Sequence, residues 1–243
     1  PEVLSQLPRE RVIAALDARH GEVVVEGWQK GTGTTIFDGI ERLRPYVGGF
    51  LVTFVEGEGR MGGMDLDQVA EVVEAAGDAR VTVAGGVAEA DEVGGIDSVG
   101  ADVQVGMALY SGKMKLADAI AAPLHSDRED GLWATVIVDE YERALGLAWS
   151  DLESLREAVK TKCGAYHSRR RGLWVKGKTS GNTQKLIRID LDCDRDALRF
   201  VVRQGGEGFC HSGTWTCWGP ERGLPGLSRL LRARVDEAPE GSY

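Results

Sequence analysis

The first half of this 243-residue chain alternates four times between a short apolar run and an amphipathic stretch, and this alternation limits the possible folds more than any other feature. The apolar runs are rich in β-branched residues, which suits strands buried in a parallel sheet. We expect strands over residues 11–18, 49–56, 80–87 and 101–109, and helices over residues 34–46, 65–76, 89–99 and 115–122. Four such α/β units, joined by right-handed crossovers, are half of a (βα)8 barrel, whose full length is about 250 residues.

A polar and charged segment over residues 124–131 separates this half-barrel from a region with a different pattern. There we expect strands over residues 133–138 and 144–147, a helix over 151–160, and strands through Tyr166 and over 173–176, 186–190 and 198–202. This mixture is typical of an α+β domain. The predicted domains are residues 1–124 and 125–220, with a tail over 221–243. In the tail, a short apolar stretch over residues 227–231 favours a loosely docked helix before a disordered end.

The composition excludes an integral membrane protein. Apolar residues make up 42% of the chain, and no apolar run approaches the roughly 20 residues that cross a bilayer. No basic start followed by an apolar segment marks the chain for secretion, so we expect a cytoplasmic protein. In a reducing compartment, spaced cysteines bind metal or take part in chemistry more often than they form disulfides, and we interpret the four cysteines as thiols.

The two halves of the chain differ in charge. Residues 1–127 carry 10 basic and 21 acidic residues, a net charge of −11, whereas residues 128–243 carry 19 and 17, a net charge of +2. In the second half, the stretch from Lys160 to Arg188 contains basic residues and no acidic ones. Such a stretch attracts an anion, either a phosphate group or a nucleic acid, or is simply a solvated basic face.

Acidic and cysteine residues gather near the end of the second domain. Asp192, Asp194 and Asp196 alternate on a segment that we expect to be extended, so the carboxylates share one side and suit Mg²⁺, while Cys193 points to the other. Three thiolates, from Cys193, Cys210 and Cys217, with an open fourth position describe a catalytic Zn²⁺ site. His211 is a possible fourth ligand. The alternative is that the thiols belong to the core and the aspartates to a solvated turn; we assign Cys163 to packing.

The order and spacing of four sequence runs resemble phosphoribosyl-AMP cyclohydrolase along its whole length. The runs are LAWSDLESL (residues 147–155), YHSRRRGLWVKGKTSGNTQ (166–184), DLDCDRDAL (190–198) and CHSGTWTC (210–217). The resemblance implies Mg²⁺ at the three aspartates and Zn²⁺ at the three cysteines. In that family the zinc site is shared, with the cysteine of the aspartate run coming from one subunit and the other two from its partner. The resemblance therefore also implies a homodimer.

The reaction of that family explains these residues. Opening the adenine ring between N1 and C6 needs a hydroxide near neutral pH, which zinc supplies by lowering the pKa of its bound water from 15.7 to about 7. His211 is expected to transfer the proton to the leaving nitrogen, or to orient the neighbouring zinc ligand. Phosphate groups of the substrate account for the basic stretch, with candidate contacts from Arg169, Arg171, Lys176, Thr179, Ser180 and Gly181.

Two positions depart from this family's pattern. Lys178 and Asn182 stand where Glu and His are usual. This departure keeps open a second hypothesis, a catalytically silent module in which zinc only holds a dimer together. A nucleic-acid binder is a third hypothesis, which the few aromatic residues of the basic stretch, Tyr166 and Trp174, do not favour.

The first domain resembles the C-terminal half of the isomerase that acts on phosphoribosylformimino-AICAR ribotide. The matching runs are ALDARHGEVVVEGWQ (residues 15–29), VTFVEGEGRMGGMD (52–65), AGGV (84–87) and VGMALYSG (105–112), and Glu58 stands where Asp is common. The resemblance implies that Asp17 is a catalytic acid or base, with Thr53 as its neighbour. It makes Gly85, Gly86 and Gly106 a phosphate cradle. The second catalytic aspartate of that family belongs to the first half-barrel, so we expect no isomerase activity from this chain alone. Another chain, carrying that half or a second copy of this one, is expected to complete the barrel.

Overall fold

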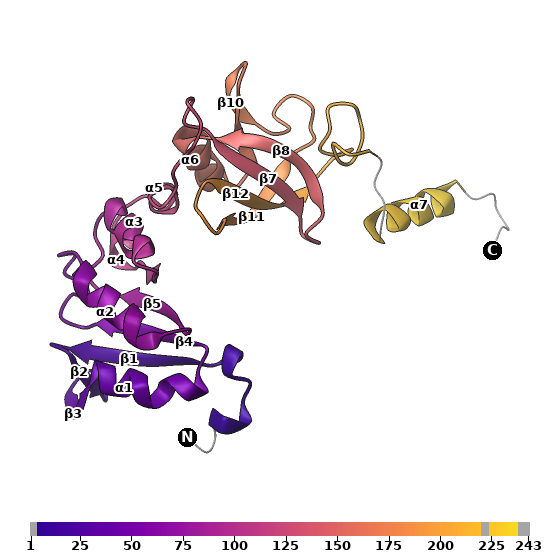
Figure 1. Ribbon diagram of the computed structural model, residues 1–243. Coiled ribbons are helices and arrows are strands. Elements are labelled where there is room, and N and C mark those ends of the chain that lie inside the picture. Colours follow the sequence, from indigo (N-terminus) through magenta and orange to yellow (C-terminus); the bar gives the residue numbers. More distant parts are fainter. Residues whose placement is uncertain (1–3, 220–223, 238–243) are drawn as a thin grey trace. The chain divides into compact units, whose positions relative to one another are not determined.

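The computed structural model describes residues 4–219 and 224–237, which fall into two compact units. One unit takes in residues 1–124 and the other residues 125–243 (Figure 1). None of the helices in these described residues is both long enough and apolar enough to cross a membrane.

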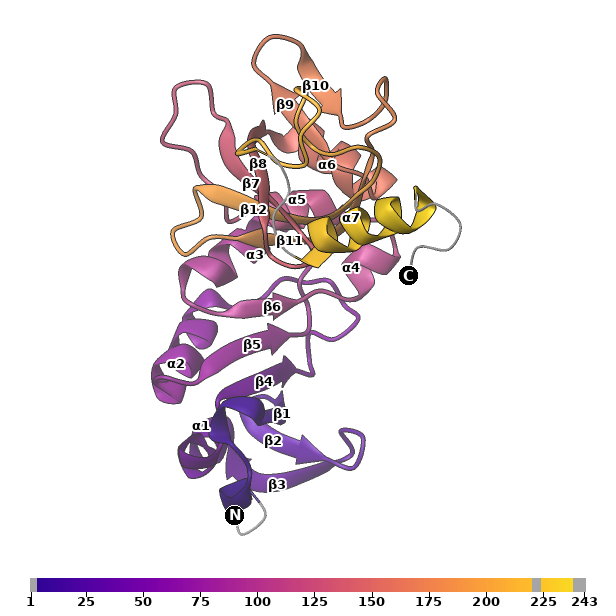
Figure 2. The same ribbon diagram turned by 90° about the vertical axis from the view of Figure 1, so that its right-hand side faces the viewer.

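The first unit is built on one six-stranded sheet with the order β3-β2-β1-β4-β5-β6. Strands β1, β4, β5 and β6 are parallel and lie side by side (Figure 2). Strands β2 and β3 form an antiparallel hairpin at the β1 edge. The strands are β1 Ile13–Arg19, β2 Glu22–Val25, β3 Lys30–Thr35, β4 Gly49–Phe54, β5 Arg80–Ala84 and β6 Asp102–Gln104.

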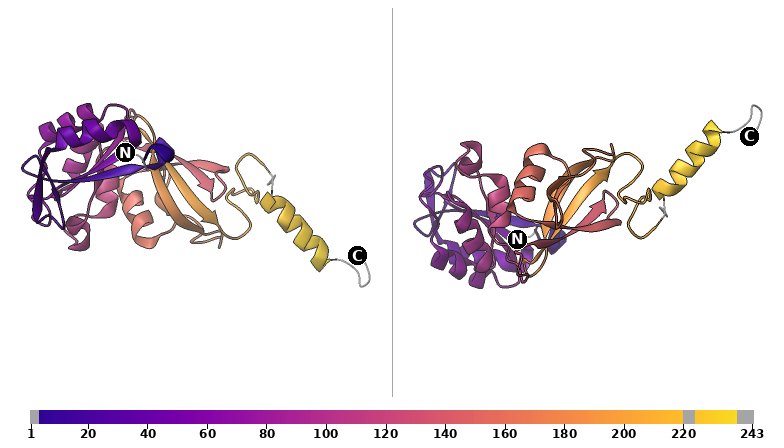
Figure 3. Two further views of the ribbon diagram at one scale, coloured as in Figure 1. Left: turned by 90° about the horizontal axis from the view of Figure 1, so that it is seen from below. Right: turned by 90° about the horizontal axis from the view of Figure 1, so that it is seen from above.

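The core of this unit lies between the sheet and its helices. Along β4, Phe50, Val52 and Phe54 are buried, whereas the alternating Leu51 and Thr53 are only partly buried. The buried side chains pack in one cluster with residues such as Ile40 of the helix layer, so the helices cover one face of the sheet. The purple helices in Figure 3 show this layer. The helices are α1 Ile36–Leu43, α2 Leu66–Ala76, α3 Ala90–Ser98, α4 Met107–Tyr110 and α5 Leu116–Ala121, with short 3-10 turns at Leu4–Gln6, Arg9–Arg11 and Arg44–Tyr46.

The predicted alternation of strands and helices is confirmed, but several boundaries differ; the strand expected over residues 80–87, for example, ends at Ala84. The helix expected over residues 34–46 starts at Ile36, because Thr35 caps it and the preceding Gly-rich segment pairs as β3. The hairpin of β2 and β3 was missed, since β3 is almost wholly exposed and carries no apolar alternation. The strand expected over residues 101–109 ends at Gln104, and α4 follows Gly106 directly.

The second unit contains another six-stranded sheet, with the order β10-β9-β8-β7-β12-β11. All its pairs are antiparallel except β12 with β7. Its interior holds Ile137, Leu145, Leu155, Tyr166 and Phe200, each with no exposed surface. The strands are β7 Trp133–Asp139, β8 Ala144–Ser150, β9 Ala165–Ser168, β10 Gly172–Val175, β11 Gln184–Leu191 and β12 Ala197–Gln204. The predicted strands are all present, with ends that differ by a few residues.

Helix α6 (Leu152–Thr161) starts at a strong N-terminal cap. An Asp151 carboxylate oxygen accepts from the Ser154 N–H at 2.8 Å, and the Ser154 hydroxyl accepts from the Asp151 N–H at 2.9 Å. The second carboxylate oxygen lies 2.7 Å from His167 Nδ1 on β9. Burial raises the pKa of Asp151, but the hydrogen bonds from Ser154 and His167 outweigh it and bring the pKa below 3.8. The cap therefore ties α6 to the sheet in its ionised form.

We expect Asp151→Ala to lower the free energy of unfolding by about 1–2 kcal/mol at neutral pH, because the helix loses its cap. A carboxyl group whose pKa is lowered on folding stabilises the protein above its ordinary pKa and loses this effect as the pH falls through the lowered value. The difference from the wild type should therefore shrink once the pH drops below 3.8. Urea unfolding at several pH values measures this difference in the free energy of unfolding. Glu153→Ala, at an exposed position of the same helical turn, is the control. An equal loss in both variants would show that the cap is unimportant.

Helix α7 (Leu224–Asp236), yellow in Figure 3, lies in the tail. It extends beyond the apolar stretch over residues 227–231 from which a helix was predicted. Leu227, Leu231 and Val235 are exposed along it. The end predicted to be disordered, over residues 238–243, lies outside the described residues.

Candidate metal and substrate site

The three aspartates lie together at the turn between β11 and β12. Each offers a carboxylate oxygen, and these atoms all lie within 4.8 Å of one another. The segment was predicted to be extended, and this is wrong: the chain bends over residues 193–196, and Arg195 has a left-handed φ of 63°. The turn is closed by hydrogen bonds between Asp192 and Ala197 in both directions, at 3.2 Å and 3.1 Å. The carboxylates therefore converge through a tight turn and not through strand alternation.

The cluster brings three carboxylates together in a turn where the Arg195 guanidinium donates to the Asp192 carbonyl oxygen. A hydrogen bond with Asp192, burial and the charges of Asp194 and Asp192 together raise the pKa of Asp196. Burial raises the pKa of Asp192, but hydrogen bonds from the Ala197 N–H and from the neighbouring carboxyl groups outweigh it and lower the pKa. The crowding thus makes Asp196 harder to ionise than Asp192. A divalent cation with oxygen ligands relieves such crowding, so these residues fit Mg²⁺.

Cys210 and Cys217 form a second cluster, on the loop that follows β12. The Ser212 N–H donates to the Cys210 sulfur at 3.5 Å. Hydrogen bonds from Ser212, Thr214 and Cys217 lower the pKa of Cys210 to about 7. Burial and the neighbouring Cys210 raise the pKa of Cys217. The two thiols therefore interact directly, and one of them is readily ionised, as a zinc ligand must be.

Cys193 does not join these two thiols within one chain. It is exposed, and its sulfur lies 3.9 Å from an Asp194 carboxylate oxygen. In residues 4–219 and 224–237, the aspartate cluster is the only set of three potential ligands whose atoms all lie within 4.8 Å. The structure therefore brings together two of the three predicted thiol ligands and leaves Cys193 at the aspartate turn. His211, predicted as a proton carrier, is exposed directly after Cys210.

The residues predicted to bind phosphate lie in two different environments. Arg169 and Arg171 are exposed, with the Arg169 guanidinium 5.9 Å from the Trp149 ring centre, and the turn of Thr179, Ser180 and Gly181 is exposed as well. Lys176 is instead only 6% exposed, and its Nζ lies 5.0 Å from the ring centre of Phe209. Burial lowers its pKa, while Cys217 and Cys210 counteract that shift, so the ammonium lies beside the thiol pair.

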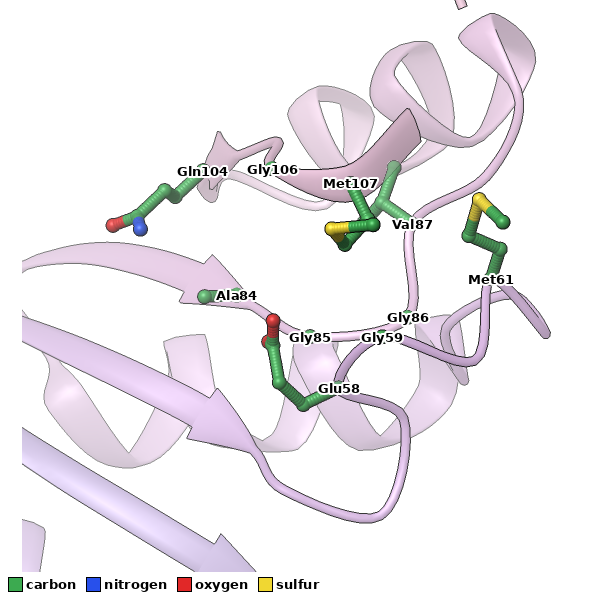
Figure 4. Close-up of a pocket in the computed structure, with 10 residues that line it drawn as sticks. All are labelled: Glu58, Gly59, Met61, Ala84, Gly85, Gly86, Val87, Gln104, Gly106 and Met107. Carbon is green, nitrogen blue, oxygen red and sulfur yellow. The ribbon is translucent and has the colours of Figure 1, made fainter. Parts of the chain in front are cut away.

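The first unit carries a pocket at the carboxyl ends of β4, β5 and β6 (Figure 4). Gly85, Gly86 and Gly106, which were predicted to bind phosphate, line it together with Glu58 and Gln104. The backbone needs glycine here: a Cβ on Gly85, whose φ is +97°, would lie 2.4 Å from the Phe54 carbonyl oxygen.

Asp17 and Thr53, the predicted catalytic pair of the first unit, face each other as direct partners of β1 and β4. The Trp28 indole N–H donates to the Asp17 carboxylate at 2.9 Å. Trp28 belongs to the β2–β3 hairpin loop and has a left-handed φ of 69°. Sequence reasoning missed this contact because it missed the hairpin.

Each of the two units matches the model of a known protein family. The family model "Phosphoribosyl-AMP cyclohydrolase" matches residues 146–219, and the model "Histidine biosynthesis protein" matches residues 1–115. The phosphoribosyl-AMP cyclohydrolase of Thermobifida fusca is 48% identical over 96 residues, which cover 38% of this chain and 81% of that protein.

Longer, multifunctional proteins of histidine biosynthesis are also similar to about half of this chain. The histidine biosynthesis bifunctional protein his7 of Schizosaccharomyces pombe is 53% identical over 131 residues, or 54% of this chain and 31% of that protein. The trifunctional protein of Neurospora crassa is 53% identical over 133 residues, or 55% of this chain. The match spans only 15% of the Neurospora protein. The chain therefore belongs to the phosphoribosyl-AMP cyclohydrolase family, with a histidine-biosynthesis domain ahead of its cyclohydrolase domain.

Proposed function

We propose that the chain opens the adenine ring of phosphoribosyl-AMP by hydrolysis of the N1–C6 bond, giving phosphoribosylformimino-AICAR ribotide. One observation carries the proposal. Within the span matched by the cyclohydrolase model, residues 146–219, three carboxylates converge within 4.8 Å, and the thiols of Cys210 and Cys217 lie close enough to shift each other's pKa. Hard oxygen ligands and soft sulfur ligands are thus sorted into two clusters, as a two-metal hydrolase needs.

Cys210 and Cys217 are proposed to hold Zn²⁺ together with Cys193 of a second copy, which makes the protein a homodimer. The separation of Cys193 from the thiol pair in one chain supports this arrangement. When bound, zinc supplies a hydroxide nucleophile near neutral pH. The side chain of Lys176 is buried beside Cys210 and Cys217. There its positive charge offsets the negative charge of the thiolates. Its role is therefore proposed to be at the zinc ligands and not at a phosphate group.

Asp192, Asp194 and Asp196 are proposed to hold Mg²⁺ at the turn. His211 follows a thiol ligand directly and is exposed, so it is free to move a proton to the leaving ring nitrogen. The exposed guanidinium groups of Arg169 and Arg171 and the turn of Thr179, Ser180 and Gly181 are proposed to bind the substrate's phosphate groups. Arginine suits this role because its planar fork binds phosphate through two hydrogen bonds.

The first unit is proposed to be half of a (βα)8 barrel, in which Asp17 and Thr53 occupy the carboxyl ends of β1 and β4. An aminoaldose to aminoketose rearrangement needs an acid and a base on opposite sides of the ribose, and Asp17 supplies one of them. We therefore propose that the isomerase reaction requires a second half-barrel. The pocket of Figure 4 places Glu58 among the cradle glycines, and its charge opposes phosphate binding there.

The test is an assay of the purified chain with phosphoribosyl-AMP, following the absorbance change of ring opening. Turnover that needs zinc and magnesium, disappears on chelation and returns on adding both metals supports the proposal. A folded chain that binds zinc and dimerises but shows no turnover with its metals restored would instead support the catalytically silent assembly module.

A further inference from the structure

The side chain of Asn182 joins two loops of the second unit that are distant in sequence. Its Oδ1 accepts a hydrogen bond from the Glu207 backbone N–H at 3.0 Å. The Asn182 backbone N–H donates to the Ser180 hydroxyl at 3.3 Å. Asn182 also packs against Gly206, where a Cβ would lie 2.3 Å from the amide oxygen. Asn182 therefore fixes the phosphate-binding turn of residues 179–181 against the loop of residues 205–208.

The inner side of the same loop is held by a buried amide network. Gln204 Nε2 lies within hydrogen-bonding distance of the carbonyl oxygens of Gly205 and Gly208, at 2.6 Å and 3.2 Å. Gln184 Nε2 donates to Gln204 Oε1 at 2.8 Å, and the Tyr166 hydroxyl donates to Gln184 Oε1 at 2.6 Å. Burial raises the pKa of Tyr166, so this hydroxyl keeps its proton. The loop is thus fastened from the core by Gln204 and from the surface by Asn182.

The loop leads directly into the thiol pair. Gly208 packs so tightly that a Cβ would lie 2.6 Å from the Thr214 carbonyl oxygen. The next two residues form hydrogen bonds across the loop. The Phe209 N–H donates to the Trp215 carbonyl oxygen at 3.0 Å, and the Cys210 N–H donates to the Thr214 carbonyl oxygen at 3.1 Å. A shift at Glu207 is therefore passed on to Cys210, since close-packed segments move together.

We propose that Asn182 is a positioning residue that sets the Cys210 loop relative to the phosphate-binding turn. This inference rests on the proposed cyclohydrolase function and gives a role to a residue that the sequence marks only as a departure from the family. Metal binding at the thiols and substrate binding at the turn are then coupled through one side chain. Losing its hydrogen bond should weaken both by roughly fivefold, the equivalent of about 1 kcal/mol.

The experiment compares Asn182→Ala, which removes the acceptor, with Asn182→Asp, which keeps an oxygen at the same place. Glu207→Ala is the matched control, because it removes an exposed side chain and leaves the backbone N–H donor. Cobalt(II) titration, followed through thiolate-to-metal absorption, measures the metal affinity without any turnover. Steady-state kinetics separate KM from kcat, and thermal unfolding reports the stability of each variant.

We expect Asn182→Ala to lose cobalt affinity and to raise KM by roughly fivefold, while Glu207→Ala behaves like the wild type. Asn182→Asp should keep the wild-type cobalt affinity, and only this affinity is compared for it, because its added charge opposes phosphate binding at the turn. The inference is overturned if Asn182→Ala matches the wild type, or if Asn182→Asp loses as much cobalt affinity as the alanine variant. A wild type that binds cobalt without turning over substrate is a different result. It would remove the proposed function, while the loss of cobalt affinity in Asn182→Ala would still support the positioning role.

Discussion

Replacing Cys210 by serine should reduce cyclohydrolase turnover on the order of a thousandfold or more, since a hydroxide nucleophile at neutral pH depends on the bound zinc. Cys210 is the thiol whose surroundings most favour the ionised form: hydrogen bonds from Ser212, Thr214 and Cys217 lower its pKa to about 7. Serine keeps the size of the side chain but offers no comparable anion. Zinc content by atomic emission and turnover of the same preparation are the two measurements.

Cys163→Ser is the matched control for this experiment. Cys163 is half-buried, its sulfur contacts the Thr161 carbonyl oxygen at 3.4 Å, and it is not among the proposed zinc ligands. This variant should keep its zinc and its turnover. Full zinc content in Cys210→Ser with normal turnover would show that the thiol pair is not the metal site. Equal losses in both variants would show that any thiol substitution disturbs the fold.

The strands and helices of the first unit could be predicted because each buries one apolar face. Leu16 and Ala18 on β1 and Val81 and Val83 on β5 alternate with less buried residues, and α1 and α2 carry apolar stripes. The β2–β3 hairpin could not be found in this way. Its second strand buries nothing, and backbone pairing leaves no periodic trace in the sequence.

The residues of the proposed site could be chosen from the sequence, but their geometry could not be predicted. The aspartate and cysteine residues were identified by their spacing and by the family resemblance. The arrangement of the aspartates depends on a left-handed residue, Arg195, which turns the segment back on itself. The burial of Lys176 could not be predicted either. A lysine within a basic stretch is expected to be solvated, and only the tertiary structure shows that other side chains cover it. The role of Asn182 depends on Glu207, 25 residues further along the chain.

The proposed shared zinc site makes a second strong prediction, which concerns mixed dimers of two inactive variants. Cys193→Ser and Cys210→Ser should each be inactive as a homodimer, because every site then lacks one thiol. In a mixed dimer, the Cys193 of one subunit meets the intact Cys210 and Cys217 of the other at one of the two sites. Heterodimers purified through two different tags should therefore recover about half of the wild-type turnover per dimer.

A second mixed dimer tests whether the recovery arises because the zinc ligands come from two subunits. Cys210→Ser paired with Cys217→Ser should stay inactive, because both thiols come from the same subunit and each site of the mixed dimer lacks one of them. Cys210 and Cys217 lie close enough in one chain to shift each other's pKa, whereas Cys193 lies at the aspartate turn. If both mixtures are inactive, the zinc site is built within one chain, and Cys193 has to reach the thiol pair by a movement of the β11–β12 turn. If both mixtures recover, the thiols of the two subunits are interchangeable, and the assignment of two ligands to one loop fails.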